Sequence, residues 1–468
     1  MPATHQAVFA EMVSDGHADK ALTTKNSEDT GLCFWRNSFS RYLPFSLEPV
    51  DWDASASQAK FGATGVKYEV PRQGDLLWHT YAKILLPGIV GVYRDPSDGS
   101  TRVLKGENSV HWHNAIGIRA LQNLTLSVGG IQIVNFDETF NYINTLVTQT
   151  PGRRLREAIG KFDTVGEQQA YARRSHTCYV PLPLPNNEHV GNALPLCAMT
   201  FHKVMLDASF ATRAKCVIVP EGAPAGVQIC VRPDGVKDAD IESGKVTVEP
   251  LADNHLRCLF EGTMVYLETQ ERALFTDTVF EQLISEVQST SVQASFHGSL
   301  AGETTPPVKL KVPLPFANIV SEYLWVVRTQ AKEDKNRHYD FGGYVEGEED
   351  GFPYTLDPLK EVAVKYANAP RVSSRPADYF RLVQPHNFHR YGESAETNFI
   401  YNWSFAVHPE SEQASGGCNH SRVDDVSLEC ALDARIFSPE SPTAEVIVYG
   451  RAWNLLRYRQ GTLLRRFT

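Results

Sequence analysis

The sequence lacks the short motifs that mark most nucleotide-dependent enzymes and many hydrolases. It contains no GxGxxG, no GxxxxGK[ST], no HExxH and no GxSxG. Glycine-rich loops of the first two kinds hold phosphates with backbone N–H groups, so their absence removes the usual way of binding a nucleotide. Kinase, nucleotide-hydrolase and dehydrogenase functions are therefore disfavoured.

Long apolar runs and paired cysteines are also missing. The longest apolar stretch, around Ile84–Tyr93, contains Pro87 and Gly88 and reaches about half of the ~20 residues that a membrane-spanning helix needs. The first twenty residues include three acidic ones and lack the basic-then-apolar order of a signal peptide. The eight cysteines form no CxxC pair, which is typical of free thiols. We expect synthesis and retention in a reducing compartment.

An excess of positive charge is absent as well. Lys and Arg number 45 against 55 Asp and Glu, a formal net charge of −10. Coating nucleic acid requires clustered basic residues, so the bulk charge argues against that role. The 468 residues are 42% hydrophobic, with 27 prolines and 32 glycines. This composition predicts a turn-rich, β-rich globular protein with substantial cores.

Alternating apolar and polar residues predict strands along most of the chain. Leu124–Val128 alternates, meets Gly129-Gly130 and resumes at Ile131–Ile133, which predicts a hairpin across a two-residue glycine turn. Val308–Val312 and Val426–Leu432 alternate in the same way. Each pattern gives a strand one buried face and one polar face.

Helix signals are few. A capping box, Thr278-x-x-Glu281, precedes an i, i+3, i+4, i+7 apolar stripe that starts at Phe280, so the pattern predicts a helix over 278–287. Further helices are expected at Asp137–Val147 and Arg153–Lys161. They read as insertions between strands and not as a βαβ alternation, which disfavours an α/β parallel sheet.

Proline and glycine positions suggest how the chain is divided. We expect an N-terminal arm at 1–24, a first β unit at 25–219, a linker at 220–253 and a second β unit at 254–468. The linker is predicted to carry a small hairpin of Val227–Val231 with Lys245–Val248, and Glu333–Gly351 is predicted to be an acidic surface loop.

Two histidine pairs have spacings that suit metal ligands. His111 and His113 would share one face of a strand, as in a cupin metalloenzyme, but the Glu that such a site needs a few residues later is missing. We therefore favour histidines that are hydrogen-bonded at a strand end. His386 and His389 sit beside a proline with no carboxylate at ligand spacing, which favours polar packing in a loop.

The remaining charged clusters have equally ordinary explanations. Asp51 and Asp53 suggest a solvated turn, and Asp424-Asp425 beside Arg422 suggests a local ion pair that opens a strand. The last eighteen residues contain five arginines and no acidic residue, interleaved with apolar ones. A final strand with a basic outer face explains this pattern better than a nucleic-acid site does.

Many segments, in order, give the chain a resemblance to the major capsid proteins of nucleocytoplasmic large DNA viruses, the double jelly-roll family. The resemblance spans roughly residues 30 to 460, with mild departures at Trp403 and Ala414. The segments that carry it in the first half are Gln73-Gly-Asp75, Leu86-Pro87, Val110–Asn114, Ile116-Gly117, Gly129–Ile133, Tyr179–Pro183 and Ala193–Leu196. Those in the second half are Val265–Thr269, Glu271-Arg272, Tyr379-Phe380, Val383–Pro385, Ser404–Ala406, Pro409-Glu410, Gln413–Gly416, Asn419, Ser421–Asp424 and Trp453–Arg457.

The resemblance implies an all-β fold of two tandem eight-stranded antiparallel jelly rolls with short helical insertions in loops. It implies a structural protein of the virion, not an enzyme, with no cofactor, metal or catalytic residue. Three copies would form a pseudo-hexameric capsomer, and capsomers would tile an icosahedral shell. The implied partners are the chain itself, neighbouring capsomers, minor capsid proteins and an underlying membrane, without sequence-specific nucleic-acid binding. Assembly would take place inside the host cell.

One loop is a candidate for a subunit contact. Its glycines permit a close backbone approach, and its polar side chains can bond locally or across a boundary. The residues concerned are Gln413, Ser415, Gly416, Asn419, Ser421, Arg422 and Asp424. Two alternatives stay open at this point, namely a two-domain cupin-like metalloenzyme that uses His111 and His113, and a jelly-roll carbohydrate-binding protein.

Overall fold

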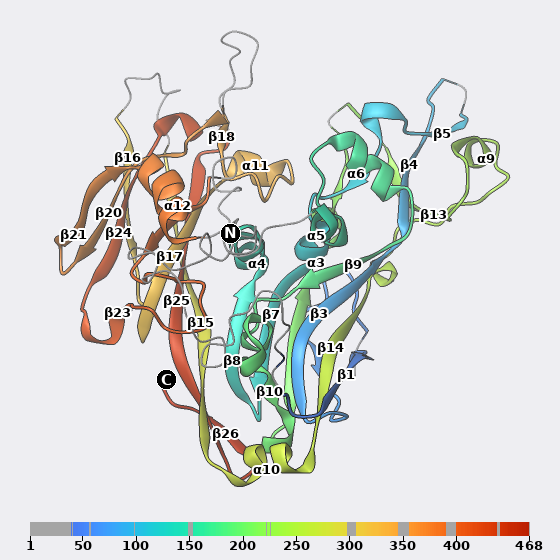
Figure 1. Ribbon diagram of the computed structural model, residues 1–468. Helices are drawn as coiled ribbons and strands as arrows, with labels where there is room; N and C mark the ends of the chain where they lie inside the picture. The colour runs from blue at the N-terminus through green and yellow to red at the C-terminus, as the bar shows by residue number, and fades with distance from the viewer. Residues whose placement is uncertain are drawn as a thin grey trace, which may run out of the picture. The chain divides into compact units, whose positions relative to one another are not determined.

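Antiparallel strands dominate the chain in the computed structural model (Figure 1). The structure describes residues 39, 41–55, 58–97, 99–147, 153–220, 222–224, 226–296, 306–344, 355–389, 399–437 and 440–467. Ser46–Thr468 form one compact unit. The expected arm at 1–24 and the part of the expected acidic loop from 345 to 351 lie outside the described residues.

The first set of strands forms two main sheets. One sheet has the order β1-β14-β3-β10, with β9 also paired to β3, and contains β1 (Phe45–Trp52), β3 (Leu76–Leu86), β9 (His176–Pro181), β10 (Leu194–Pro195) and β14 (Arg257–Leu267). The other has the order β2-β11-β7-β8 and contains β2 (Val66–Glu69), β7 (Leu121–Val128), β8 (Ile131–Asp137) and β11 (Val204–Phe210). Burial alternates residue by residue along β11, as expected for a sheet with one face on a core.

Two small sheets extend this first set. One has the order β13-β4-β5 and contains β4 (Gly88–Arg94), β5 (Thr101–Val103) and β13 (Gln228–Arg232). The other pairs β6 (His111–Trp112) with β12 (Val217–Ile218).

The second set of strands repeats the plan. Its larger sheet has the order β15-β25-β17-β22, to which β23 and β26 add, and contains β15 (Phe280–Ser295), β17 (Ile319–Thr329), β22 (Tyr401–Ser404), β23 (Cys418–Asn419), β25 (Thr443–Arg459) and β26 (Thr462–Arg465). The other sheet has the order β16-β24-β20-β21 and contains β16 (Val308–Pro313), β20 (Leu359–Tyr366), β21 (Ala369–Pro376) and β24 (Val426–Leu432). A short pair joins β18 (Gly343–Tyr344) to β19 (Thr355–Leu356).

Each set has the paired antiparallel sheets of a jelly roll, and both contribute to one continuous group of buried apolar side chains. We call them the first jelly roll (β1–β14) and the second jelly roll (β15–β26).

The helices are short and lie between strands, as expected. They are α3 (Ile116–Ala120), α4 (Glu138–Val147), α5 (Arg153–Ala158), α6 (Val165–Ala172), α7 (Pro185–Glu188), α8 (Arg213–Cys216), α9 (Asp238–Glu242), α10 (Thr269–Asp277), α11 (Gln330–Asp334) and α12 (Gln384–Phe388).

Several predicted elements are confirmed. Strands β7 and β8 form the predicted hairpin, in which Gly129 and Gly130 have φ of 58° and 85°. A side chain at Gly129 would also meet the ring of His202, because its Cβ would lie 2.6 Å away. The alternating segments 308–312 and 426–432 are β16 and β24, which pair with each other, and α4 and α5 form where helices were expected.

The predicted helix over 278–287 is wrong, because this segment is the start of strand β15. All sixteen residues of β15 pair with β25, from Phe280 opposite Tyr458 to Ser295 opposite Thr443. Its buried face includes Gln282 and Glu286, which are polar. Because polar residues occupy part of the buried face, the alternation that marks a strand could not be recognised from the apolar residues. Pairing with the long strand β25 overrides the local preference of this segment for a helix.

The predicted linker hairpin also has the wrong main partner. Its first half is strand β13, but β13 pairs with β4 of the first jelly roll. The segment near 250 meets β13 in a single bridge, Cys230 opposite Pro250, flanked by backbone hydrogen bonds from Val231 to Glu249 and from Leu251 to Ile229. Helix α9 lies between the two segments. Similarly, β14 falls in the expected second unit but pairs with β3 over Leu76–Leu85.

Two simpler observations complete the fold. The seven cysteines in the described part of the chain are all free thiols, and only Cys418 is not fully buried. Within the same part of the chain, none of the helices combines the length and the apolar character needed to cross a bilayer.

Candidate functional site

The histidines of the HxH pattern are buried and hydrogen-bonded at a strand end, as predicted. The Nδ1 atom of His111 lies 3.0 Å from the carbonyl oxygen of Trp112, and that of His113 lies 2.6 Å from the carbonyl oxygen of Asn114. Burial lowers the pKa of both rings, and with Arg119 nearby the pKa of His113 falls to about 3. Both rings are therefore neutral. Among the described residues, no three His, Cys, Asp or Glu side chains form a metal-binding group.

His113 instead belongs to a polar joint between the two jelly rolls, centred on Arg119 of α3. Arg119 is only 1% exposed. Its guanidinium donates to Glu138 of α4 and, at 2.8 Å, to Nε2 of His338 in the second jelly roll. Burial and the charge of Arg119 lower the pKa of His338 to about 2. The imidazole is thus kept neutral and able to accept this hydrogen bond.

Aromatic rings pack around the charged centre of the joint. Tyr142 of α4 stacks on Tyr339, with ring centroids 4.0 Å apart and planes within 7°. The ring of His113 meets Tyr339 edge-on at 5.3 Å. These rings shield Arg119 and Glu138 from water, which strengthens the attraction between the two charges.

Strands β17 and β25 add three further bonds from the second jelly roll to α4 and the residue before it. The hydroxyl of Tyr449 donates to Asp137 over 2.7 Å. Arg328 donates to the hydroxyl of Thr139. Arg451 donates to the side-chain oxygen of Asn144 over 2.8 Å. We define the polar joint by eleven residues, which are His113, Arg119, Asp137, Glu138, Thr139, Asn144, Arg328, His338, Tyr339, Tyr449 and Arg451.

Arg451 also reaches a buried ionic cluster inside the second jelly roll. Its Nε atom lies 3.3 Å from Oε1 of Glu322, which is fully buried. Nε2 of His389 lies 3.0 Å from Oε2 of Glu322, and Nδ1 of His389 lies 2.5 Å from Oε1 of Glu410. Burial alone would lower the pKa of His389, but the two carboxylates outweigh it and raise the pKa to about 9. His389 is therefore an imidazolium at neutral pH.

The sequence did not predict this cluster. It placed His386 and His389 in a loop without carboxylates, whereas α12 ends beside His389 and carries it into the interior. The carboxylates come from Glu322 on β17 and from Glu410, which are distant in the sequence. A buried His with two carboxylate partners has no local spacing that would reveal it.

The basic C-terminal segment is mostly neutralised inside the same protein. Arg465 pairs with Glu286 at 2.5 Å and Arg466 with Glu281 at 2.6 Å. Arg457 also lies 3.9 Å from Glu281. The segment is the predicted final strand, formed by β25 and β26, and its arginines stabilise the pairing with β15.

Three aspartates of the pairs Asp51/Asp53 and Asp424/Asp425 form ion pairs with basic residues from other segments. Asp51 pairs with Lys83 at 2.8 Å and Asp53 with Arg257 at 3.1 Å. Asp425 lies 3.5 Å from Lys311 on β16, so the cation beside it comes from a neighbouring strand and not from Arg422.

The loop 413–424 is ordered by bonds to the second jelly roll. The hydroxyl of Ser415 bonds both backbone groups of His408 at 2.8 and 3.0 Å. Asn419 accepts from the backbone of Ser421, whose hydroxyl accepts from the backbone N–H of Asn318 at 2.9 Å. Gly416 has a φ of 137° and packs against the backbone of Phe405.

The remaining predicted residues of this loop face solvent. Gln413, Arg422 and Asp424 are exposed. The structure thus ties Ser415, Asn419 and Ser421 into local hydrogen bonds, and leaves the side chains of Gln413, Arg422 and Asp424 directed to solvent.

Removing one charge from the polar joint is expected to be costly. Arg119→Met leaves Glu138 buried without its cation, which should lower the free energy of unfolding by about 3–5 kcal/mol. The double variant Arg119→Met/Glu138→Gln removes both charges and should regain part of this loss. Tyr449→Phe, which deletes one hydrogen bond, should cost about 1 kcal/mol. Urea unfolding measures all three, and equal stability of wild type and Arg119→Met would contradict the role of the joint.

The buried imidazolium predicts a loss of stability at alkaline pH. The folded pKa of His389, about 9, exceeds the ordinary value of about 6.5. Its stabilisation is therefore complete below pH 6.5 and disappears as pH rises through 9, a change on the order of 3 kcal/mol. The stability difference between wild type and His389→Gln should shrink between pH 6.5 and 9. His386→Gln, at an exposed position, is the matched control and should leave the profile unchanged.

One family matches both halves of the chain. A model described as "Large eukaryotic DNA virus major capsid protein" matches residues 271–463, and one described as "Major capsid protein N-terminus" matches 33–243. The major capsid protein of Phaeocystis pouchetii virus is 22% identical over 96% of this chain and 97% of its own length. That of Paramecium bursaria Chlorella virus 1 is 22% identical over 97% of both chains.

Solved structures agree with this match in fold. VP54 of the virus PBCV-1 superposes with a TM-score of 0.68 and 20% identity, covering 93% of this chain and 100% of its own. The Faustovirus major capsid protein gives a TM-score of 0.66 with 10% identity, covering 97% and 96%. The chain therefore belongs to the major capsid proteins of large eukaryotic DNA viruses, structural proteins of the virion with a double jelly-roll fold.

Proposed function

We propose that three copies of this chain associate into a pseudo-hexameric capsomer, and that such capsomers tile the icosahedral shell of a large double-stranded DNA virus. The observation that carries the proposal is the repeated sheet plan within one chain. Two jelly rolls per chain give six similar β units per trimer, which approximates sixfold symmetry with only three subunits.

The polar joint supports this role. A capsomer with a fixed outline needs two jelly rolls that do not move relative to each other. Buried charges at the joint favour one orientation of the two jelly rolls. If Arg119 moved away from Glu138, both charges would be left unpaired in an interior without water. Aromatic stacking of Tyr142 on Tyr339 adds apolar contact at the same place. Each chain would then act as a single rigid piece of the shell.

We assign the domain limits on the same basis. Strand β14 pairs within the first jelly roll and β15 within the second, and α10 connects them. We propose α10, Thr269–Asp277, as the junction, which extends the first unit beyond its expected end at residue 219 and past the linker expected at 220–253.

The loop 413–424 is our candidate for a contact between subunits. Arg422 and Asp424 are exposed and of opposite charge, and Ile319 beside the loop is 45% exposed. A charged pair beside an apolar side chain is typical of the rim of a protein interface.

Minor capsid proteins and a membrane beneath the shell are the further partners that we propose for this chain. We also propose that the shell is assembled inside the host cell.

The mass in solution tests the central proposal. Light scattering on the purified full chain is expected to give three times the 52.2-kDa chain mass. Dissociation and unfolding should be coupled and depend on concentration, as in obligate oligomers. A stable monomer over the accessible concentration range would overturn the proposal.

Arg422→Ala tests the loop. If Arg422 forms part of the subunit contact, its loss should raise the dissociation constant of the trimer at least about fivefold. Arg371→Ala, at an exposed position on β21, removes the same charge elsewhere and should change little. Identical trimer yield and melting temperature for both variants would show that the loop is only an intradomain turn.

A further inference from the structure

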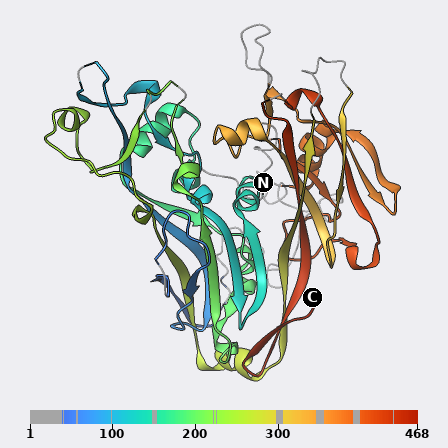
Figure 2. The same ribbon diagram turned by 180° about the vertical axis from the view of Figure 1, so that it is seen from behind.

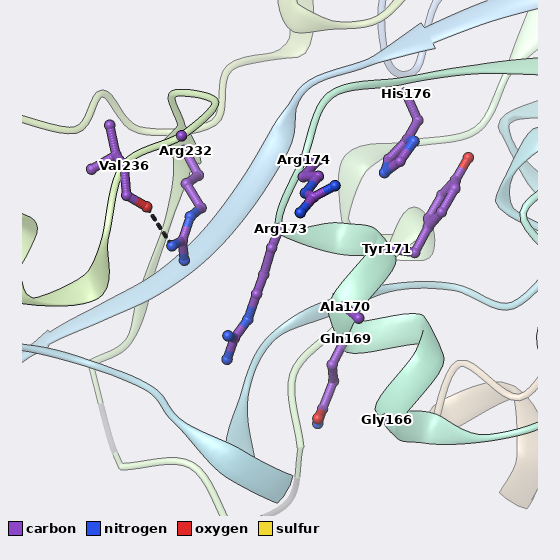
Figure 3. Close-up of a pocket in the computed structure, with 10 residues that line it drawn as sticks. Gly166, Gln169, Ala170, Tyr171, Arg173, Arg174, His176, Arg232 and Val236 are labelled. Atoms are coloured by element: carbon purple, nitrogen blue, oxygen red, sulfur yellow. Dashed lines mark hydrogen bonds between the residues drawn. The ribbon is translucent and has the colours of Figure 1, made fainter.

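A pocket of about 690 Å³ opens at one end of the first jelly roll, and three arginines line it. Arg173 and Arg174 follow helix α6, and Arg232 ends strand β13. Figure 3 shows the guanidinium ends of Arg173 and Arg232 reaching into the space between α6 and the turn at 232–236, while Arg174 points toward His176. In a chain with a net charge of −10, three guanidinium groups around one pocket are a local reversal of charge.

The pocket is held in shape by bonds that neutralise part of its charge. Arg232 is fixed by Asp238 at 2.5 Å and by the carbonyl oxygen of Val236 at 2.6 Å. The turn at Asp234 is tied to Ser175, whose backbone N–H and hydroxyl both donate to the Asp234 carboxylate. Asp234 also interacts electrostatically with Arg174. Two carboxylates therefore face three guanidinium groups.

Close backbone packing holds the segments that carry Arg173 and Arg232 next to each other. Gly88 lies opposite Arg232 in the ladder of β4 and β13. A Cβ at position 88 would lie 3.0 Å from the carbonyl oxygens of both Arg173 and Arg232. Since the three backbones meet this closely, the two side chains start from fixed points on neighbouring segments.

Among the described residues of this pocket, Arg173 is the arginine whose charge is not balanced by a neighbouring carboxylate. It is exposed, and in the part of the chain that the structure describes no carboxylate within ion-pair distance of its guanidinium is recorded. A guanidinium with free N–H groups binds a planar or tetrahedral oxyanion through two parallel hydrogen bonds. The arrangement of one anchored and two less constrained arginines fits a ligand that carries more than one anionic group.

We propose that this pocket binds an acidic oligosaccharide, through sulfate or carboxylate groups set along the sugar chain. A volume of about 690 Å³ is in the range of small-ligand pockets. The ring of Tyr171 is stacked on His176 with centroids 3.8 Å apart, so that one face of each ring is not open to a nucleobase. Single-stranded nucleic acid needs such faces together with a long basic groove.

The test is a titration of the full-length assembled protein with a fluorescently labelled heparin tetrasaccharide at several salt concentrations. Arg173→Gln/Arg174→Gln is expected to weaken binding at least about tenfold, which corresponds to the loss of one charged hydrogen bond. Arg371→Gln/Arg375→Gln, on β21 of the second jelly roll, removes the same charge away from the pocket. It should bind like wild type, and melting temperatures should show that all three proteins are folded.

Three results would overturn the proposal. The first is no saturable binding by wild type, and the second is equal weakening in the two double variants, which would indicate bulk electrostatics alone. The third is a labelled oligodeoxynucleotide of the same charge that binds as tightly and depends equally on Arg173 and Arg174, which would assign the pocket to nucleic acid. None of these outcomes depends on whether the capsomer is a trimer.

Discussion

Taking the guanidinium of Arg119 out of water is the constraint on which the arrangement of this chain depends. A buried cation is tolerated only if nearby groups replace its lost hydration. Here Glu138 comes from the first jelly roll and His338 from the second, so neither half alone can satisfy Arg119. The hydrogen bonds of Arg119 to Glu138 and His338 therefore fix the orientation of the two jelly rolls relative to each other. The neutrality of His338 follows from the same demand, because only an unprotonated nitrogen accepts from a guanidinium.

The polar joint and the buried ionic cluster are linked through Arg451. This side chain donates to Asn144 at the joint and lies beside Glu322 in the cluster. Strand β25 carries both Tyr449 and Arg451, and alternate residues of a strand share a face. One face of one strand thus supplies bonds to the joint and a counter-ion to the second jelly roll. Packing in the second jelly roll and docking of the first are for this reason physically coupled.

The sequence predicted local features well and distant ones poorly. The hairpin around Gly129-Gly130 depends on neighbouring residues and a two-residue turn, so its pattern was sufficient. Strand β15 was mistaken for a helix because its identity depends on β25, about 160 residues away in the chain. His389 looked isolated because Glu322 and Glu410 reach it only in the folded protein. The resemblance to a known family supplied the global plan, which no local pattern contains.

The ladder between β15 and β25 has a mechanical consequence. Its sixteen residue pairs run antiparallel without interruption, and the arginines near its end are pinned to Glu281 and Glu286. A force along the strands loads all of these hydrogen bonds in shear, so they must fail together. A force across the strands peels them apart one after another and meets far less resistance. The second jelly roll is therefore stiffest along the β25 axis.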